Sequence, residues 1–180
     1  MKKDPRIKNL ERIHKKLQST TDRLGMPIDK GIFNTVKYLN ALGYKTSMSC
    51  EGHLKKSGKL PNGGLPFPWV VIDYANDNAD LQKMTDSERK LYKKNQLKKC
   101  FPVMNEILGL IDEFYKNRHH VPSIHKITVI PFHQGKLRIQ SLSGYFIEAQ
   151  PKKVQSEWFF ITSMEMRYFT KFLGIKYFSK

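Results

Sequence analysis

Cysteine is scarce in this sequence, and long apolar runs are missing from it. Two cysteines, Cys50 and Cys100, occur among 180 residues, too few for the disulfide framework of a small secreted protein. No stretch of about 18 apolar residues would form a membrane-spanning helix. Residues 1–6 lead into a charged amphipathic segment, where a signal peptide would have an apolar core. These absences predict reduced cysteines, no membrane partner and a cytoplasmic location.

Acidic residues are also few. Sixteen Asp and Glu stand against 32 Lys and Arg, which gives a formal net charge of +16. A charge of this size predicts nucleic acid or a nucleotide as the partner, because neutralising phosphates releases their counterions. A lysine-rich surface without such a partner would give the same composition. The sequence has neither the glycine fingerprint of a dinucleotide-binding fold nor a phosphate loop of the G-x-x-x-x-G-K type.

Apolar residues at helical spacing, together with capping residues, predict four or five helices, depending on whether Pro102 kinks a helix or separates two. The signals are, in chain order, Asp4 and Asp29 as N-caps, Gly43 as a helix end, a capping box from Thr85, Pro102 as a kink or break, and Gly174 as the end of the last helix. Four strands are expected at 44–49, 69–72, 126–132 and 136–142, with a fifth left open at 145–149.

Helices that bracket a few strands and a hairpin indicate an α+β fold. We expect one domain over residues 1–180, with a small mixed or antiparallel sheet covered by helices. Residues 54–68 are rich in Gly and Pro, which predicts a flexible loop between the first two strands. Lys55, Lys56 and Lys59 make this loop basic, so it is expected to steer an anionic ligand.

The stretch T-S-M-S-C-E-G-H at residues 46–53 is the most chemically dense part of the sequence. Cys50, Glu51 and His53 are the predicted catalytic residues: the thiol as nucleophile, the carboxylate as base and the imidazole as partner of either. Thr46, Ser49 and Gly52 are expected to help bind the ligand, since a glycine turn at a strand end presents backbone amides to an anion.

Other readings of this stretch stay open. Cys50, Glu51 and His53 also offer metal donors, and the distant histidines that would complete such a site are His119, His120, His125 and His133. Their spacing matches no familiar zinc pattern, so no metal ligands are assigned. The stretch is alternatively only a tight turn with a buried cysteine.

Two ligand-binding residues are expected from other strands. Asp73 ends the second strand and is a candidate acid, base or ribose partner if it faces the turn. Arg138 shares a strand face with Gln140, which suits a phosphate or a base edge.

The segment from Ile28 to Val70 resembles two groups of proteins. One is a set of small bacterial proteins with an S-C-E-G-H turn. The other, more distant, is the methyltransferase family of tRNA wybutosine synthesis, which it resembles over residues 28–73. The matching residues are Asp29, Thr46, Ser49, Cys50 and Gly52, while His53 stands where that family has arginine. This resemblance implies an S-adenosylmethionine-dependent methylation of a tRNA base at the turn.

Together these features predict a cytoplasmic enzyme or ligand-binding domain that acts on a nucleotide or nucleic acid at residues 49–53. The alternatives are a non-catalytic nucleic-acid-binding module, which would bind through Lys90, Lys93, Lys94, Lys98 and Lys99, and a protein-interaction subunit. In both, the cysteine turn is structural. Neither the oligomeric state nor the reaction follows from the sequence.

Overall fold

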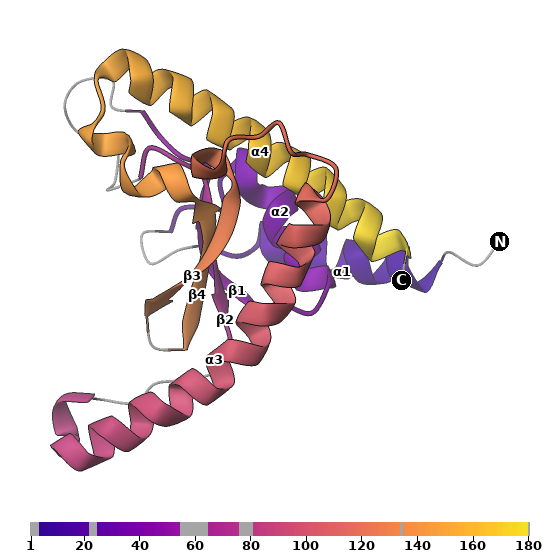
Figure 1. Cartoon of the computed structure of the whole chain (residues 1–180). Coiled ribbons are helices and arrows are strands. Elements are labelled where there is room, and N and C mark those ends of the chain that lie inside the picture. Colours follow the sequence, from indigo (N-terminus) through magenta and orange to yellow (C-terminus); the bar gives the residue numbers. More distant parts are fainter. Residues whose placement is uncertain (1–3, 22–24, 55–64, 76–80, 134, 180) are drawn as a thin grey trace.

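A four-stranded antiparallel sheet forms the centre of the protein (Figure 1). The computed structural model describes residues 4–21, 25–54, 65–75, 81–133 and 135–179. The strands are β1 (Thr46–Cys50), β2 (Trp69–Asp73), β3 (Ile127–His133) and β4 (Lys136–Ser141). Their order in the sheet is β1-β2-β4-β3. The predicted α+β class is confirmed, and the sheet is antiparallel throughout.

Four helices cover one face of this sheet; the first of them packs on the second, and the other three contact the strands directly (Figure 1). They are α1 (Pro5–Gln18), α2 (Lys30–Ala41), α3 (Asp86–Tyr115) and α4 (Lys152–Ser179). Val70 and Ile72 of β2 and Leu137 and Ile139 of β4 are almost completely buried against them. The period of two in a strand places Val71, Arg138 and Gln140 on the opposite face. The core therefore lies between the sheet and the helices.

The predicted helix starts are confirmed at Asp4 and Thr85. The Asp4 side chain accepts a hydrogen bond from the Arg6 backbone N–H at 2.8 Å, with proline at the first helical position. Thr85 and Glu88 exchange the two hydrogen bonds of a capping box. These local interactions fix where α1 and α3 begin.

Of the two predicted helix interruptions, the kink or break at Pro102 turns out to be a continuous helix, which was one of the two alternatives, and the end at Gly174 was wrong. Helix α3 continues through Pro102, because Cys100 and Ile107 on either side of the proline are both buried in the core. Helix α4 does not end at Gly174. A Cβ at that position would lie 3.1 Å from the Tyr38 ring, so the glycine instead allows α4 to pack closely against α2.

The fifth strand considered at 145–149 does not form. This segment contains two short 3-10 turns, η4 (Leu142–Tyr145) and η5 (Ile147–Ala149). Strand β4, which precedes it, already pairs with β2 on one side and β3 on the other, so it has no free edge for a following strand. The fully buried Ile147 instead anchors the segment.

His125 is expected to make the fold sensitive to acid. Its ring lies edge-on against Trp158, with 5.4 Å between centroids, and burial lowers the pKa of His125 below its ordinary 6.5 despite the nearby Glu165. The unfolded chain therefore binds the proton at a higher pH than the folded protein. The free energy of unfolding should be fully retained above pH 6.5 and fall as the pH decreases below it, by at most about 1.4 kcal/mol per pH unit.

Urea unfolding between pH 7.5 and pH 5 measures this effect. His125→Gln should flatten the pH dependence, whereas His120→Gln, at an exposed position, should leave it unchanged. Equal pH profiles for the wild-type protein and the His125 variant would contradict the assignment.

Candidate functional site

A sharp turn follows β1 and reverses the chain at Gly52. The φ angle of Gly52 is +87°, which L side chains rarely adopt, and a Cβ here would lie 2.8 Å from the backbone carbon of Phe67. The backbone N–H of His53 then donates to the Leu65 carbonyl at 2.9 Å. The turn is thus fixed both by its own dihedral angle and by the segment that leads into β2.

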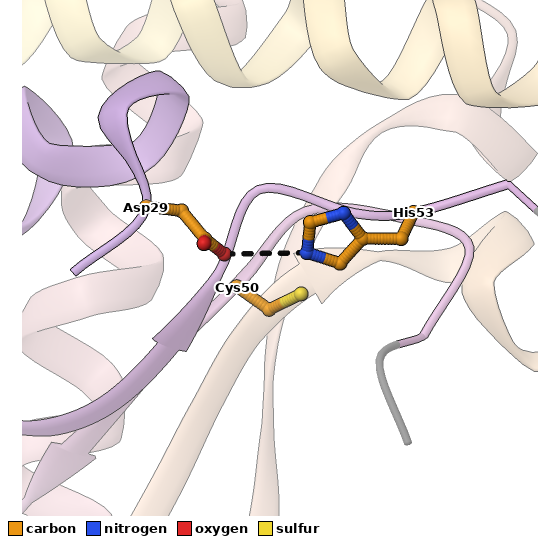
Figure 2. A group of neighbouring side chains, drawn as sticks. All are labelled: Asp29, Cys50 and His53. Carbon is orange, nitrogen blue, oxygen red and sulfur yellow. Dashed lines mark ion pairs between the residues drawn. The ribbon is translucent and has the colours of Figure 1, made fainter. Parts of the chain in front are cut away.

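Asp29, Cys50 and His53 come together beside this turn (Figure 2). One donor atom from each, a carboxylate oxygen, the Sγ and an imidazole nitrogen, lies within 4.8 Å of the other two. The Nε2 atom of His53 is 3.5 Å from Oδ2 of Asp29. The reversal at Gly52 therefore brings the Cys50 and His53 side chains together, as the sequence prediction required.

Glu51 caps the first turn of α2 with its side chain, although Asp29 occupies the N-cap position. Asp29 occupies the N-cap of α2 but its side chain makes no capping hydrogen bond. Glu51 Oε2 instead accepts the N–H of Gly31, in the first turn of α2, at 2.6 Å. The Asp29 carboxylate is thereby free to accept the Glu51 backbone N–H at 3.1 Å and to face His53.

The Cys50 thiol is buried and polarised by backbone amides. Its residue is 6% exposed, and Sγ accepts hydrogen bonds from the backbone N–H groups of Gly52, at 3.3 Å, and Leu65. Burial raises the pKa of the Cys50 thiol, and the carboxylates of Asp29 and Glu51 raise it further, against the lowering by the two amides. This is the opposite of the lowered pKa that a nucleophilic thiolate needs.

A cavity of about 240 Å³ adjoins the turn. Glu51 and Gly52 form one wall, and α4 forms the opposite wall with aromatic rings and methionines. Ser163 and Arg167 of α4 add polar groups. The full lining is Gly31, Glu51, Gly52, Pro68, Phe159, Phe160, Ser163, Met164, Met166 and Arg167. The turn thus faces a cavity as well as the core.

Thr46 and Asp73 lie away from the turn. Strands β1 and β2 are antiparallel, so Thr46 pairs with Ile72 at the end of the sheet opposite to Cys50, which pairs with Trp69. Asp73 accepts a hydrogen bond from Ser47 at 2.6 Å and lies 3.4 Å from the Lys136 ammonium. Asp73 therefore contacts the start of the 46–53 stretch at Ser47 and lies away from the turn at Gly52, because the two strands are antiparallel.

The other predicted ligand residues are only partly near the turn. Ser49 precedes Cys50 and pairs with Val70 in the sheet. Arg138 pairs with Val71 in the middle of the sheet, with its guanidinium over the Phe132 ring at 4.6 Å, so it is not part of the turn. The loop lysines Lys55, Lys56 and Lys59 lie outside the described residues.

The histidines considered as metal ligands also lie elsewhere. His125 packs on Trp158, and His133 packs on Phe132. In the part of the chain that the structure describes, the metal-compatible group contains Asp29, and neither Glu51 nor any of the four distant histidines. Asp29 was predictable from the sequence as a helix cap and as a residue of the resemblance, whereas Ser163 and Arg167 were not, because no motif marks them.

Comparisons with known proteins indicate no function for this chain, so its function is inferred from the site. No protein-family model, no curated protein and no solved structure matches this chain. Among the described helices, none is both long and apolar enough to cross a membrane. The resemblance to the wybutosine-synthesis methyltransferases stays a prediction.

Proposed function

We propose that the protein binds a nucleotide, free or within a nucleic acid, with the base in the cavity between the turn and α4. The make-up of this cavity carries the proposal. Aromatic rings and methionines line it, and a carboxylate, a hydroxyl and a guanidinium border it. A planar ring with polar edges and an attached anion complements such a site.

The size of the cavity supports one ring as its occupant. Its volume of about 240 Å³ is below the about 300 Å³ at which pockets for drug-sized ligands begin. A base would contact Phe159 and Met164, and the sugar and phosphate would extend outside. Apolar and aromatic surfaces of this kind stabilise a base by stacking and by removing it from water.

Polar groups in the wall match the edge of a base. The Ser163 hydroxyl is buried and has no hydrogen-bond partner within the described residues. Glu51 presents a carboxylate whose orientation is fixed by Gly31. A base offers both donors and acceptors, so it can satisfy the hydroxyl and the carboxylate together. In an enzyme of this kind, Glu51 is the residue positioned to act as general base.

Arg167 is placed to contact the phosphate. It is exposed at the edge of the cavity and makes no ion pair with any residue that the structure describes. A guanidinium binds phosphate oxygens through two parallel N–H groups. The net charge of +16 adds a long-range attraction for the same ligand.

Arg167→Gln is expected to weaken nucleoside monophosphate binding by about tenfold or more, since a hydrogen bond to a charged group contributes about 1.5–3 kcal/mol. Lys171→Gln removes the same charge from α4 outside the cavity and should change the affinity little. Isothermal titration calorimetry with the four monophosphates measures both. Met164→Trp, which fills the cavity, should abolish saturable binding. Equal losses for Arg167 and Lys171 would contradict the proposal.

A second candidate function is favoured by the shape of α3. Its N-terminal half extends beyond the sheet (Figure 1) and exposes Lys90, Lys93, Lys94, Lys98 and Lys99. None of these lysines forms an ion pair with another described residue, so they are available for a phosphate backbone.

The salt dependence of oligonucleotide affinity distinguishes binding by the α3 lysines from binding in the cavity. If α3 carries the affinity for single-stranded oligonucleotides, each lost lysine contact should reduce the slope of log K against log salt by about 0.7. Arg167→Gln and Met164→Trp would then leave oligonucleotide binding unchanged.

A further inference from the structure

The three side chains beside the turn have the donor types and the spacing of a transition-metal site. We propose that Asp29, Cys50 and His53 bind one Zn²⁺ ion through Oδ2, Sγ and Nε2. The mixed sulfur, nitrogen and oxygen set suits zinc, whereas Mg²⁺ and Ca²⁺ prefer oxygen ligands alone. Three protein ligands leave the fourth tetrahedral position open to water or to another ligand.

The distance between His53 and Asp29 fits a shared metal better than a hydrogen bond. Their Nε2 and Oδ2 atoms are 3.5 Å apart. Good N–H···O hydrogen bonds in proteins measure about 2.7–3.2 Å. Two nitrogen or oxygen ligands at opposite ends of a tetrahedral edge around zinc are about 3.3 Å apart, given bond lengths of about 2.0–2.1 Å. The pair is thus already at the separation that an ion would impose.

The sulfur needs only a small adjustment to join them. Each donor atom of the trio lies within 4.8 Å of the other two. A zinc-bound sulfur, with a bond of about 2.3 Å, lies about 3.6 Å from a neighbouring ligand atom. The sulfur is therefore at most about 1.2 Å beyond the separation that a shared zinc ion would impose.

Backbone amides already hold two of the three ligands in place. The Asp29 oxygen that faces His53 also accepts the Glu51 N–H at 3.1 Å. The Cys50 sulfur accepts N–H groups from Gly52 and Leu65, donors that stabilise the thiolate form once a metal replaces its proton. Such outer hydrogen bonds orient the ligands of known metal sites and strengthen binding.

Burial and charge agree with an ion at the protein surface. Cys50 is almost fully buried beneath the site, whereas the side chains of His53 and Asp29 are 32% and 33% exposed. An ion can therefore enter from the His53 and Asp29 side. A carboxylate and a thiolate together neutralise Zn²⁺, which avoids leaving an uncompensated charge next to the core.

Cobalt titration of the full-length protein, prepared free of metal, tests the proposal. Co²⁺ reports the same ligands by colour: one equivalent should give a sulfur-to-cobalt charge-transfer band and intense four-coordinate visible bands. One equivalent of Zn²⁺ should remove both. Absence of the charge-transfer band, or binding without a 1:1 endpoint, would overturn the site.

Variants locate the ion. Cys50→Ala, His53→Gln and Asp29→Asn should each weaken Co²⁺ and Zn²⁺ binding at least tenfold, since loss of even an outer-shell partner costs about 10–100-fold. Cys100→Ala and His120→Gln remove the same donor types elsewhere and should bind as the wild type does. Circular dichroism confirms that each variant is folded. Unchanged affinity in Cys50→Ala, or loss in Cys100→Ala, would overturn the assignment.

The metal site does not depend on the proposed nucleotide site. Arg167→Gln should bind Co²⁺ as the wild type does, even if it no longer binds nucleotides. Loss of metal binding in Cys50→Ala with full nucleotide affinity would show two separate sites, and failure of either titration alone would leave the other result intact.

Discussion

Gly52→Ala is expected to lower the free energy of unfolding by about 2–5 kcal/mol. Two penalties add. A left-handed conformation costs an L residue about 1–2 kcal/mol, and the φ angle here is +87°. The new methyl group would also lie 2.8 Å from the Phe67 backbone and 3.0 Å from the Phe159 ring, and such overpacking costs about 1–3 kcal/mol.

Gly25→Ala is the matched control for Gly52. Its φ angle of +76° imposes a similar backbone penalty, but no atom of the described residues lies within 4 Å of the added Cβ. It should therefore lose only about 1–2 kcal/mol. Urea unfolding followed by tryptophan fluorescence measures both variants. Equal losses would show that the turn after β1 is not closely packed between Phe67 and Phe159.

Gly52→Ala should also impair the site, because the same turn positions Cys50 and His53 and forms the wall of the cavity. Cobalt binding measured in the folded fraction of this variant should be weaker than in Gly25→Ala. Strong cobalt binding in both variants would show that the ligand geometry tolerates a shift of the turn.

Glu165→Ala is expected to destabilise the protein by about 3–5 kcal/mol, the range found when one partner of a buried ion pair is removed. Glu165 is 5% exposed, and its carboxylate pairs with Arg118, whose guanidinium packs over the Phe114 and Tyr168 rings. It also accepts the Tyr115 hydroxyl at 3.1 Å. Its loss leaves a half-buried guanidinium without its anion between α3 and α4.

The Tyr115 hydroxyl connects this pair to the sheet. It accepts the backbone N–H of Ile127, the first residue of β3, at 2.8 Å, and burial, with the nearby Glu165, raises the pKa of Tyr115. The effect of Glu165→Ala should therefore include weaker protection of the Ile127 amide in hydrogen exchange.

Glu157→Ala provides the control for Glu165. It lies on α4 at an exposed position and should change stability by less than about 0.5 kcal/mol. A double-mutant cycle with Arg118→Ala should give a coupling of about 1–3 kcal/mol. A coupling near zero would show that the pair contributes through packing alone.

The local sequence by itself determined most of the secondary structure and the fold class. The Thr85–Glu88 capping box and the Asp4–Pro5 helix start act within a few residues, so their physics is contained in the sequence. The turn at Gly52 was predictable for the same reason, because a glycine after a strand end permits a positive φ.

Contacts between residues far apart in the sequence decided where α4 ends, where Asp73 lies and how many strands the sheet has. Its residue type predicts that Gly174 ends a helix, yet its role is close packing against Tyr38, which is 136 residues away in the chain. The antiparallel register separated Asp73 from the turn, and the occupied edges of β4 prevented a fifth strand. Local propensity cannot anticipate these outcomes because the deciding contacts join residues far apart in sequence.

In the candidate site, too, the local sequence determined some features and the tertiary structure determined the others. The sequence determined that a thiol, a carboxylate and an imidazole would lie around one glycine. Only the tertiary structure placed the start of α2 beside that turn, so that Glu51 binds the helix N–H and Asp29 turns toward Cys50 and His53. It also placed α4 across the turn to form the cavity. Backbone hydrogen bonds between distant segments select which side chains meet, and no spacing rule within residues 46–53 contains that information.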